Sequence, residues 1–180
     1  MVVMDATTLM LLIDPTAKPP KNPATGAPVD RCKDRIEFLI TTLSEAGEGG
    51  TQIIIPTPVL SEVLVRAGKA KAQYLNEFTS SYSFRIAPFD EKAAIELAFL
   101  IDADLQSGKR LSDVETKAKV KFDRQIIAIA KVQGAKVIYS DDSGLKTVAE
   151  ANGLAVIPTW ELPTPPMKQA ELSLEPPSQP

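Results

Sequence analysis

Two short apolar runs constrain the fold of this chain more than any other feature of its sequence. The segment Val2–Asp5 begins Val-Val-Met, and the segment Gln52–Ile55 ends in three isoleucines. Neither run alternates with polar residues, as a strand with one solvent-exposed face does. Continuous apolar strands are typical of parallel sheets that helices cover on both faces. We therefore predict strands at both segments, and further strands at 84–87, 136–139 and 154–157.

Segments with helical spacing of apolar residues lie between these strands. The predicted helices span residues 30–46, 57–67, 71–79, 90–108, 121–132 and 143–151. Strands that alternate with helices in this way predict an α/β fold. We expect a mostly parallel central sheet of about five strands, with helices on both faces.

Several side chains are predicted to begin these helices. Thr57, followed by Pro58, is predicted to cap its helix, because threonine accepts a bond from a free amide and proline suits the first turn. Thr7 or Thr8 is predicted to cap a short helical turn that runs through Ile13.

Two other side chains are predicted to lie in the core. Phe122 falls on the apolar side of the predicted helix 121–132, together with Ile126. Cys32 falls on the apolar stripe of an earlier helix and is the only cysteine. A single cysteine excludes an internal disulfide, and a free cysteine on such a stripe is usually a small buried residue.

Proline marks two irregular segments. Residues 14–29 contain five prolines and one glycine, which predicts an unusually long loop. Residues 161–180 are also proline-rich and are predicted to form a disordered tail. The compact domain is therefore predicted to span residues 1–160. The charged residues 109–120 form a connection for which the sequence predicts no regular structure.

Composition limits the class of protein. With 180 residues and 44% hydrophobic residues, the chain fits one domain with a substantial core. No apolar run is long enough to cross a membrane, and the first residues lack the features of a signal peptide, so we expect a cytoplasmic protein. A net charge of −3 argues against a general nucleic-acid binder but allows a local basic face.

The chain contains no histidine. This excludes Ser-His-Asp and Cys-His catalysis within the chain, and also a zinc hydrolase site built on histidine. Carboxylates that bind hard cations such as Mg²⁺ or Mn²⁺ remain available, because these ions prefer oxygen ligands.

Acidic residues recur where the predicted strands and helices meet. Asp5 ends the first strand, Glu62 lies one turn into the helix after the second, and Asp141 and Asp142 follow the fourth. Asp123 lies near the start of the helix that precedes the fourth strand. Since sites in open parallel sheets lie beyond the carboxyl ends of the strands, we expect these acids to meet. Packed carboxylates repel one another, so the pattern predicts a cage for one or two divalent cations.

Each acid also has a structural interpretation, as a helix cap or as the partner of a nearby cation. These alternatives are Asp5 as a helix cap, Glu62 paired with Arg66, Asp123 paired with Lys119 or Arg124 or acting as a first-turn acid, and Asp141 or Asp142 as turn and cap residues. The cations around Asp123 have two interpretations as well. Lys117, Lys119, Lys121 and Arg124 form either a solvated connection or a patch that attracts phosphate.

The segments around these acids resemble the PIN-domain nucleases. The resemblance rests on Met4–Leu9 around Asp5, Ile55–Leu64 around Glu62, Lys121–Ala130 around Asp123, and Ser140-Asp141-Asp142, in the family's order across residues 1–160. It implies a three-layer α/β/α fold. It also implies an acidic quartet that binds Mg²⁺ or Mn²⁺, formed by Asp5, Glu62, Asp123 and one of Asp141 and Asp142. The family's pattern of a hydroxyl residue, any residue and Asp favours Asp142 after Ser140, and Asp141 stays an alternative.

The same resemblance implies an activity and partners. Family members cut single-stranded RNA with a metal-activated water, and many are toxins of toxin–antitoxin pairs and usually dimeric. It therefore implies RNA as the substrate, an antitoxin protein as a partner, and a homodimer. The long loop 14–29 and the tail 161–180 depart from a compact toxin. Two rival functions remain: a non-catalytic binding module, and a metal hydrolase that acts on small phosphate esters.

Overall fold

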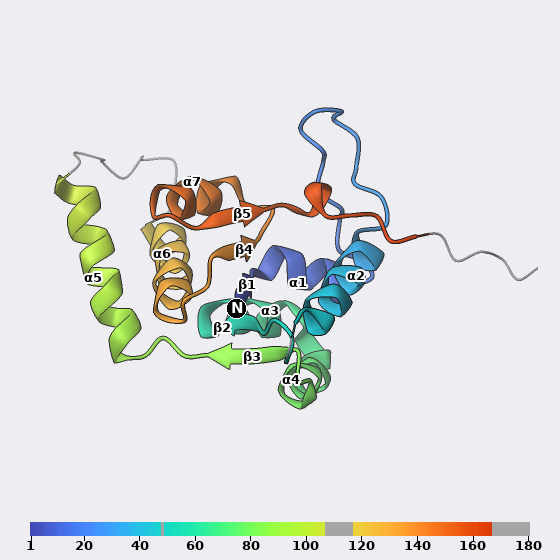
Figure 1. Cartoon of the computed structure of the whole chain (residues 1–180), viewed down its shortest axis with the longest axis horizontal. Coiled ribbons are helices and arrows are strands. Elements are labelled where there is room, and N and C mark those ends of the chain that lie inside the picture. Colours follow the sequence, from blue (N-terminus) through green and yellow to red (C-terminus); the bar gives the residue numbers. More distant parts are fainter. Residues whose placement is uncertain (48, 107–116, 167–180) are drawn as a thin grey trace, which may run out of the picture.

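One sheet of five parallel strands forms the centre of the molecule (Figure 1). The computed structural model describes residues 1–47, 49–106 and 117–166, without the side chains of residues 103–120. Along the chain the strands are β1 Val2–Met4, β2 Ile53–Pro56, β3 Phe84–Ala87, β4 Val137–Tyr139 and β5 Ala155–Ile157. Their order in the sheet is β3-β2-β1-β4-β5, with every pairing parallel. The predicted parallel sheet is thus confirmed.

Helices cover both faces of this sheet. They are α1 Ala6–Ile13, α2 Cys32–Glu45, α3 Thr57–Arg66, α4 Lys71–Ser80, α5 Glu91–Gln106, α6 Lys117–Val132 and α7 Ser143–Ala151, with short 3₁₀ turns at Gly68–Ala70 and Thr159–Glu161.

The strand order explains how the helices divide between the faces. The chain steps outward from β1 to β3 and then crosses back to β4 and β5 on the other side of β1. Because such crossovers are right-handed, α1 to α4 cover one face and α5 to α7 the other. Figure 1 shows α5, α6 and α7 on the opposite side of the sheet from α2 and α4. The fold is therefore the expected three-layer α/β/α arrangement.

The three isoleucines of β2 explain why this sheet needs both layers. Ile53, Ile54 and Ile55 are all fully buried, although their side chains point alternately to the two faces. Val3 and Met4 of β1 are fully buried as well. The apolar runs of the sequence therefore form the middle of a single core.

The hydroxyl predicted to cap α3 bonds instead to a distant segment of the chain. The strand β2 continues through Pro56, and Pro56, without a side-chain bond, occupies the cap position of α3. The hydroxyl of Thr57 accepts a hydrogen bond from the amide of Phe89 at 3.0 Å, so the predicted Thr57 cap is wrong. Thr57 instead ties the start of α3 to the segment that leads into α5.

The predicted cap of α1 is wrong for a similar reason. Asp5 occupies the cap position of α1 and makes no capping bond with its side chain. The hydroxyl of Thr8 donates to the carbonyl of Tyr139, 3.1 Å away, and so joins α1 to the end of β4. The hydroxyl of Thr7 donates to the Asp5 carboxylate.

The side chain of Phe122 is exposed, with 51% of its surface accessible, so its predicted place in the core is wrong. α6 begins at Lys117, earlier than the predicted start at residue 121, since alanine and lysine readily extend a helix. Residues 126–130 of α6 are buried. Phe122 lies one turn before this buried stretch, in a part of α6 that extends beyond the core.

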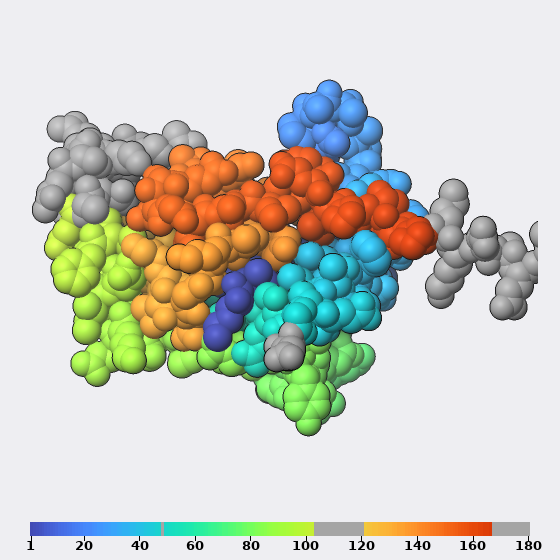
Figure 2. All heavy atoms as spheres, viewed as in Figure 1, coloured from blue at the N-terminus to red at the C-terminus, as the bar shows by residue number. Residues whose placement is uncertain are grey.

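The loop 14–29 projects from the body of the domain (Figures 1 and 2). Lys21 and Pro28 form an antiparallel bridge, and the amide of Val29 donates to the carbonyl of Pro20 at 2.8 Å. The amide of Asn22 donates to the carbonyl of Ala27 at 2.9 Å. The predicted loop is therefore confirmed, and its backbone is held by bonds within the loop.

The last described residues return to α2. Leu162 is buried, and its carbonyl accepts a bond from Nη1 of Arg35 at 2.6 Å. Nε and Nη2 of Arg35 donate to the carbonyl and the carboxylate of Asp30. The domain boundary after residue 160 stays a prediction. The tail beyond residue 166 and the connection at 107–116 lie outside the described residues.

Within the described chain, no helix combines the length and the apolar character needed to cross a bilayer.

Burial in α3 generates a stability test. Val63 is fully buried and Val65 is 72% exposed, two residues apart in the same helix. We expect Val63→Ala to lower the free energy of unfolding by about 1.5–3 kcal/mol, because each of the two buried methyl groups removed is worth about 0.8 kcal/mol and the cavity they leave adds to the loss. Val65→Ala should change it by less than about 0.5 kcal/mol. Urea denaturation measures both, and equal effects would contradict this assignment of the core.

Candidate functional site

The carboxylate of Asp5 lies at the carboxyl end of β1 and is only 6% exposed. Its Oδ2 accepts hydrogen bonds from the hydroxyls of Ser140, at 2.8 Å, and Thr7, at 3.1 Å. None of the ion pairs among the described residues includes Asp5. A buried carboxylate is therefore held by neutral hydroxyls, with no side-chain cation paired to it.

This setting raises the pKa of the Asp5 carboxyl above its ordinary value of 3.8. Burial is the largest cause, because it penalises the charged form. Hydrogen bonds from Ser140, the Ala6 amide and Thr7 lower the pKa, and the negative charge of Glu62 raises it further. Glu62 therefore acts on Asp5 through its charge, and a metal site shared by the two carboxylates stays a prediction.

Two hydroxyls connect Asp5 to the segment after β4. Oγ of Ser140 accepts a bond from the amide of Asp142 at 3.1 Å, and Oγ1 of Thr7 accepts one from the amide of Asp141 at 3.2 Å. Each hydroxyl thus donates to Asp5 and accepts from the chain that leads into α7. Sequence reasoning missed this role of Thr7, and the one available signal was its place two residues after an acid.

Glu62 is bonded to Arg66 one turn further along α3. Nη2 of Arg66 lies 2.6 Å from Oε1 of Glu62, and both side chains are about half exposed. The structural alternative for Glu62 is therefore present in the molecule. An exposed pair of this kind contributes at most about 1 kcal/mol, so a stronger ligand can separate it.

Asp141 and Asp142 both bond to nearby groups of the chain. Oδ1 of Asp142 accepts the amides of Gly144 at 2.7 Å and Leu145 at 3.1 Å, which caps α7. Both carboxylate oxygens of Asp141 accept from Thr159, one from its amide and one from its hydroxyl, each at 2.7 Å. Burial raises the pKa of Asp141, and the bonds from Thr159 lower it.

Asp123 is half-buried in the first half of α6. A helix that leads into a parallel strand starts at the carboxyl edge of the sheet, and α3 starts at that edge as well, directly after β2. α3 and α6 contact each other although they cover opposite faces. The fold therefore places the helix of Asp123 and the helix of Glu62 at the same edge of the sheet.

The donor groups suit a divalent cation by their chemistry. Asp5 and Glu62 supply carboxylate oxygens, the ligands that Mg²⁺ and Mn²⁺ prefer, and none of the ion pairs among the described residues includes Asp5. No group of three or more acidic, histidine or cysteine side chains within the described part of the chain is close enough to share a metal ion. Glu62 must leave Arg66 before it can bind a metal beside Asp5. The chemistry of the donors thus fits a hard cation, whereas the described side chains do not bring three such groups together.

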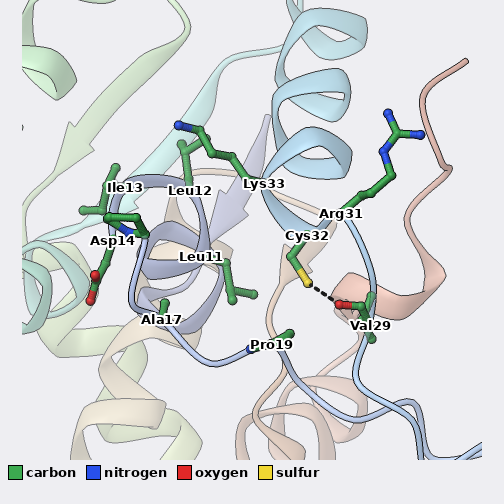
Figure 3. Close-up of a pocket in the computed structure, with 11 residues that line it drawn as sticks. Leu11, Leu12, Ile13, Asp14, Ala17, Pro19, Val29, Arg31, Cys32 and Lys33 are labelled. Atoms are coloured by element: carbon green, nitrogen blue, oxygen red, sulfur yellow. Dashed lines mark hydrogen bonds between the residues drawn. The ribbon is translucent and has the colours of Figure 1, made fainter. Parts of the chain in front are cut away.

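A separate cavity lies between α1, the loop 14–29 and the start of α2, with a volume of about 430 Å³ (Figure 3). Leu11 and Cys32 are among its lining residues, and the thiol of Cys32 donates to the carbonyl of Val29 at 3.2 Å. Burial raises the pKa of this thiol, and the charge of Asp141 raises it further. Cys32 is therefore a protonated, buried residue, as predicted, and not a nucleophile.

Comparison with known proteins identifies the fold. No protein-family model matches this sequence, and no curated protein matches it. Solved structures do match. The structure of VapBC2 from Rickettsia felis bound to a DNA fragment from their promoter aligns with a TM-score of 0.55 and 17% identity, over 88% of this chain and 98% of that chain. DNA-bound VapBC from Salmonella typhimurium aligns with a TM-score of 0.50 and 14% identity, over 88% of this chain and 97% of that chain.

The chain has a PIN-like fold. The resemblance in the sequence is thereby confirmed at the level of architecture. At 14–17% identity, these alignments show the fold alone.

The buried acid of this PIN-like domain generates a pH-dependent test. Because the pKa of Asp5 is higher in the folded than in the unfolded chain, the folded protein binds more protons between the two values, and its stability falls as pH rises through that window. Asparagine cannot ionise, so we expect Asp5→Asn to be more stable than wild type at neutral pH. The gain should vanish below about pH 3.8, where aspartate is protonated in both states.

Urea denaturation in EDTA across this pH range measures the difference. Asp34→Asn replaces an acid that pairs with Arg31 on the surface of α2, and this control should give no gain at neutral pH. An Asp5→Asn variant no more stable than wild type at neutral pH would refute a cost of burying this charge.

The cap of α7 generates a second test. Asp142→Ala removes the oxygen that accepts two backbone amides, and we expect it to lower the free energy of unfolding by about 0.5–2 kcal/mol. Asp142→Asn keeps an accepting oxygen and should stay close to wild type. Thermal and urea unfolding compare the two variants, and equal losses would show that the cap is not what Asp142 contributes.

Proposed function

We propose that this chain is a metal-dependent endoribonuclease that hydrolyses phosphodiester bonds of single-stranded RNA in the cytoplasm. One observation carries the proposal: Asp5 is buried at the carboxyl edge of a PIN-like sheet, takes part in none of the ion pairs among the described residues, and is acted on by the negative charge of Glu62. Such an edge is where open parallel sheets bind their ligands. A buried carboxylate that a second acid repels is costly for folding, and a bound cation would remove that cost.

Asp5, Glu62, Asp123 and Asp142 are the proposed ligands of Mg²⁺ or Mn²⁺, with Asp141 as the alternative to Asp142. A cation held there supplies Lewis-acid activation of a water molecule and neutralises charge on the phosphate. Asp142 is favoured because Ser140-Asp141-Asp142 matches the family's pattern of a hydroxyl residue, any residue and Asp, and because both oxygens of Asp141 bond to Thr159.

The other residues of the site orient these carboxylates. Ser140 and Thr7 hold Oδ2 of Asp5 and fix its direction relative to the start of α7. Arg66 neutralises Glu62 while no metal is bound. Once Glu62 turns to a metal, the guanidinium of Arg66 is released at the mouth of the site, where it suits a phosphate.

The same comparison supports a protein partner. Two of the similar structures are VapBC assemblies bound to DNA, one of them to a promoter fragment. We therefore propose that this chain is the toxin of a toxin–antitoxin pair, with a small antitoxin as its partner, and that it forms a homodimer.

A non-catalytic binding module is the rival function, and one observation favours it. Among the described residues, no three carboxylates lie close enough to share a metal ion. Glu62, Asp141 and Asp142 each bond to a nearby group of the chain. If the chain is a binding module, the acids stabilise the fold and the protein cleaves no nucleic acid.

Metal-dependent cleavage separates the two functions. Wild type should cleave single-stranded RNA with Mn²⁺, and Asp5→Asn should lose at least about 100-fold in rate. Mn²⁺ should also stabilise wild type, by about 2.7 kcal/mol at a concentration of 100 times Kd, and so raise its unfolding temperature. The unfolding temperature of Asp5→Asn should not change with Mn²⁺. Asp34→Asn is the matched control and should behave as wild type in both assays.

Two results would contradict the proposal. Equal cleavage by Asp5→Asn and wild type would show that Asp5 does not belong to the catalytic site. If excess wild-type protein cleaves no nucleic acid, the binding module is favoured. A panel of RNA, single-stranded DNA and nucleoside monophosphates identifies the substrate class. Activity on monophosphates alone would indicate a small-ester hydrolase. Comparison of Asp141→Asn with Asp142→Asn identifies the fourth ligand.

A further inference from the structure

A cleft of about 530 Å³ lies beside the carboxylates. Four segments contribute to its lining: Thr7 from α1, Arg66 from α3, Lys18 and Pro20 from the loop 14–29, and Asp141 from the segment after β4. The projecting loop therefore forms a wall of the cleft, a role that its sequence does not indicate.

This cleft is continuous with the candidate site. Thr7, in its lining, donates its hydroxyl to Oδ2 of Asp5 at 3.1 Å and accepts the amide of Asp141 at 3.2 Å. A ligand in the cleft is thus one side chain away from the buried carboxylate. Arg66 at its border is bonded to Glu62, so the cleft also reaches the second acid.

Two cations and two acids line the cleft, and three of the four are already engaged. The carboxylate of Asp14 accepts the amide and the hydroxyl of Thr16, that of Asp141 is bonded to Thr159, and Arg66 is paired with Glu62. Lys18 is exposed and takes part in none of the ion pairs or side-chain hydrogen bonds among the described residues. An ammonium beside an apolar lining of Met10 and Leu11 suits a phosphate of a bound strand.

The backbone around Lys18 is fixed before any ligand binds. The Asp14–Thr16 bonds and the bond from the Ala17 amide to the carbonyl of Asp14, at 3.0 Å, form a turn directly before Lys18. Pro19 and Pro20 follow it directly, and proline fixes the backbone angle φ. A loop with a fixed backbone loses less conformational entropy on binding than a flexible one.

We propose that this cleft binds the backbone of single-stranded RNA next to the bond that is cut, with Lys18 in contact with a phosphate and the loop 14–29 as one wall. This inference rests on the proposed function and adds a specific subsite to it. The cleft volume falls within the roughly 300–1,000 Å³ of small-ligand sites, which suits a short stretch of a single strand.

Binding of a labelled single-stranded RNA oligonucleotide to the full chain, measured by fluorescence anisotropy in EDTA over a range of salt concentrations, tests the subsite. Lys18→Ala should raise Kd about three- to tenfold and reduce the slope of log Kd against log salt by about 0.7, the value of one phosphate contact in a single strand. Lys21→Ala removes an exposed lysine three residues away in the same loop, outside the cleft lining, and should match wild type. Lys18→Arg should restore most of the affinity.

Cleavage assays with Mn²⁺ complete the test. Lys18→Ala should raise KM and leave kcat unchanged, because the contact binds substrate and transition state equally. Equal affinity and salt slope for Lys18→Ala and Lys21→Ala would overturn the subsite, even if the protein cleaves RNA. Lys18-dependent binding without any cleavage by wild type would sustain the subsite and refute the proposed function. Absence of RNA binding by wild type in EDTA would overturn the subsite, whereas absence of Mn²⁺-dependent cleavage would refute the proposed function.

Discussion

The burial of the Asp5 carboxylate is the constraint on which the site depends. Removing an ionised group from water is costly unless a charge or several hydrogen bonds compensate. Here the compensation comes from the hydroxyls of Ser140 and Thr7, and each also accepts an amide of the chain entering α7. The end of β1, the start of α1 and the exit from β4 are thereby joined around one negative charge. A site that destabilises the folded chain in this way persists where function requires it.

The parallel sheet determines where the other functional groups meet. Helices from opposite faces approach each other only beyond an edge of the sheet, and α3 and α6, which both start at the carboxyl edge, contact each other. Glu62 and Asp123 belong to these two helices. The loop 14–29 adds a wall on the same side, so that the cleft lined by Lys18 opens beside Asp5. The topology of the fold, rather than any one motif, therefore brings the buried acid, the lysine and the cleft together.

Sequence reasoning succeeded where a single physical preference dominates. Continuous β-branched runs are unstable unless both faces are covered, which predicts β2 and a parallel sheet. It failed where two partners compete for one group. The hydroxyls of Thr57 and Thr8 bond to distant backbone groups instead of capping their helices, and Phe122 is exposed because α6 extends past the core. Local spacing contains no information about such distant partners.

The sequence by itself determined the α/β architecture, the absence of histidine chemistry and the set of acids available for a site. Only the tertiary structure decided how each acid is used: Asp5 buried under hydroxyls, Glu62 paired with Arg66, Asp141 bonded to Thr159, and Asp142 at the cap of α7. It also decided that the proline-rich loop lines a cleft. The physical reason is range: strand and helix preferences act over a few residues, whereas hydrogen bonds and charges depend on neighbours that the fold brings from far along the chain.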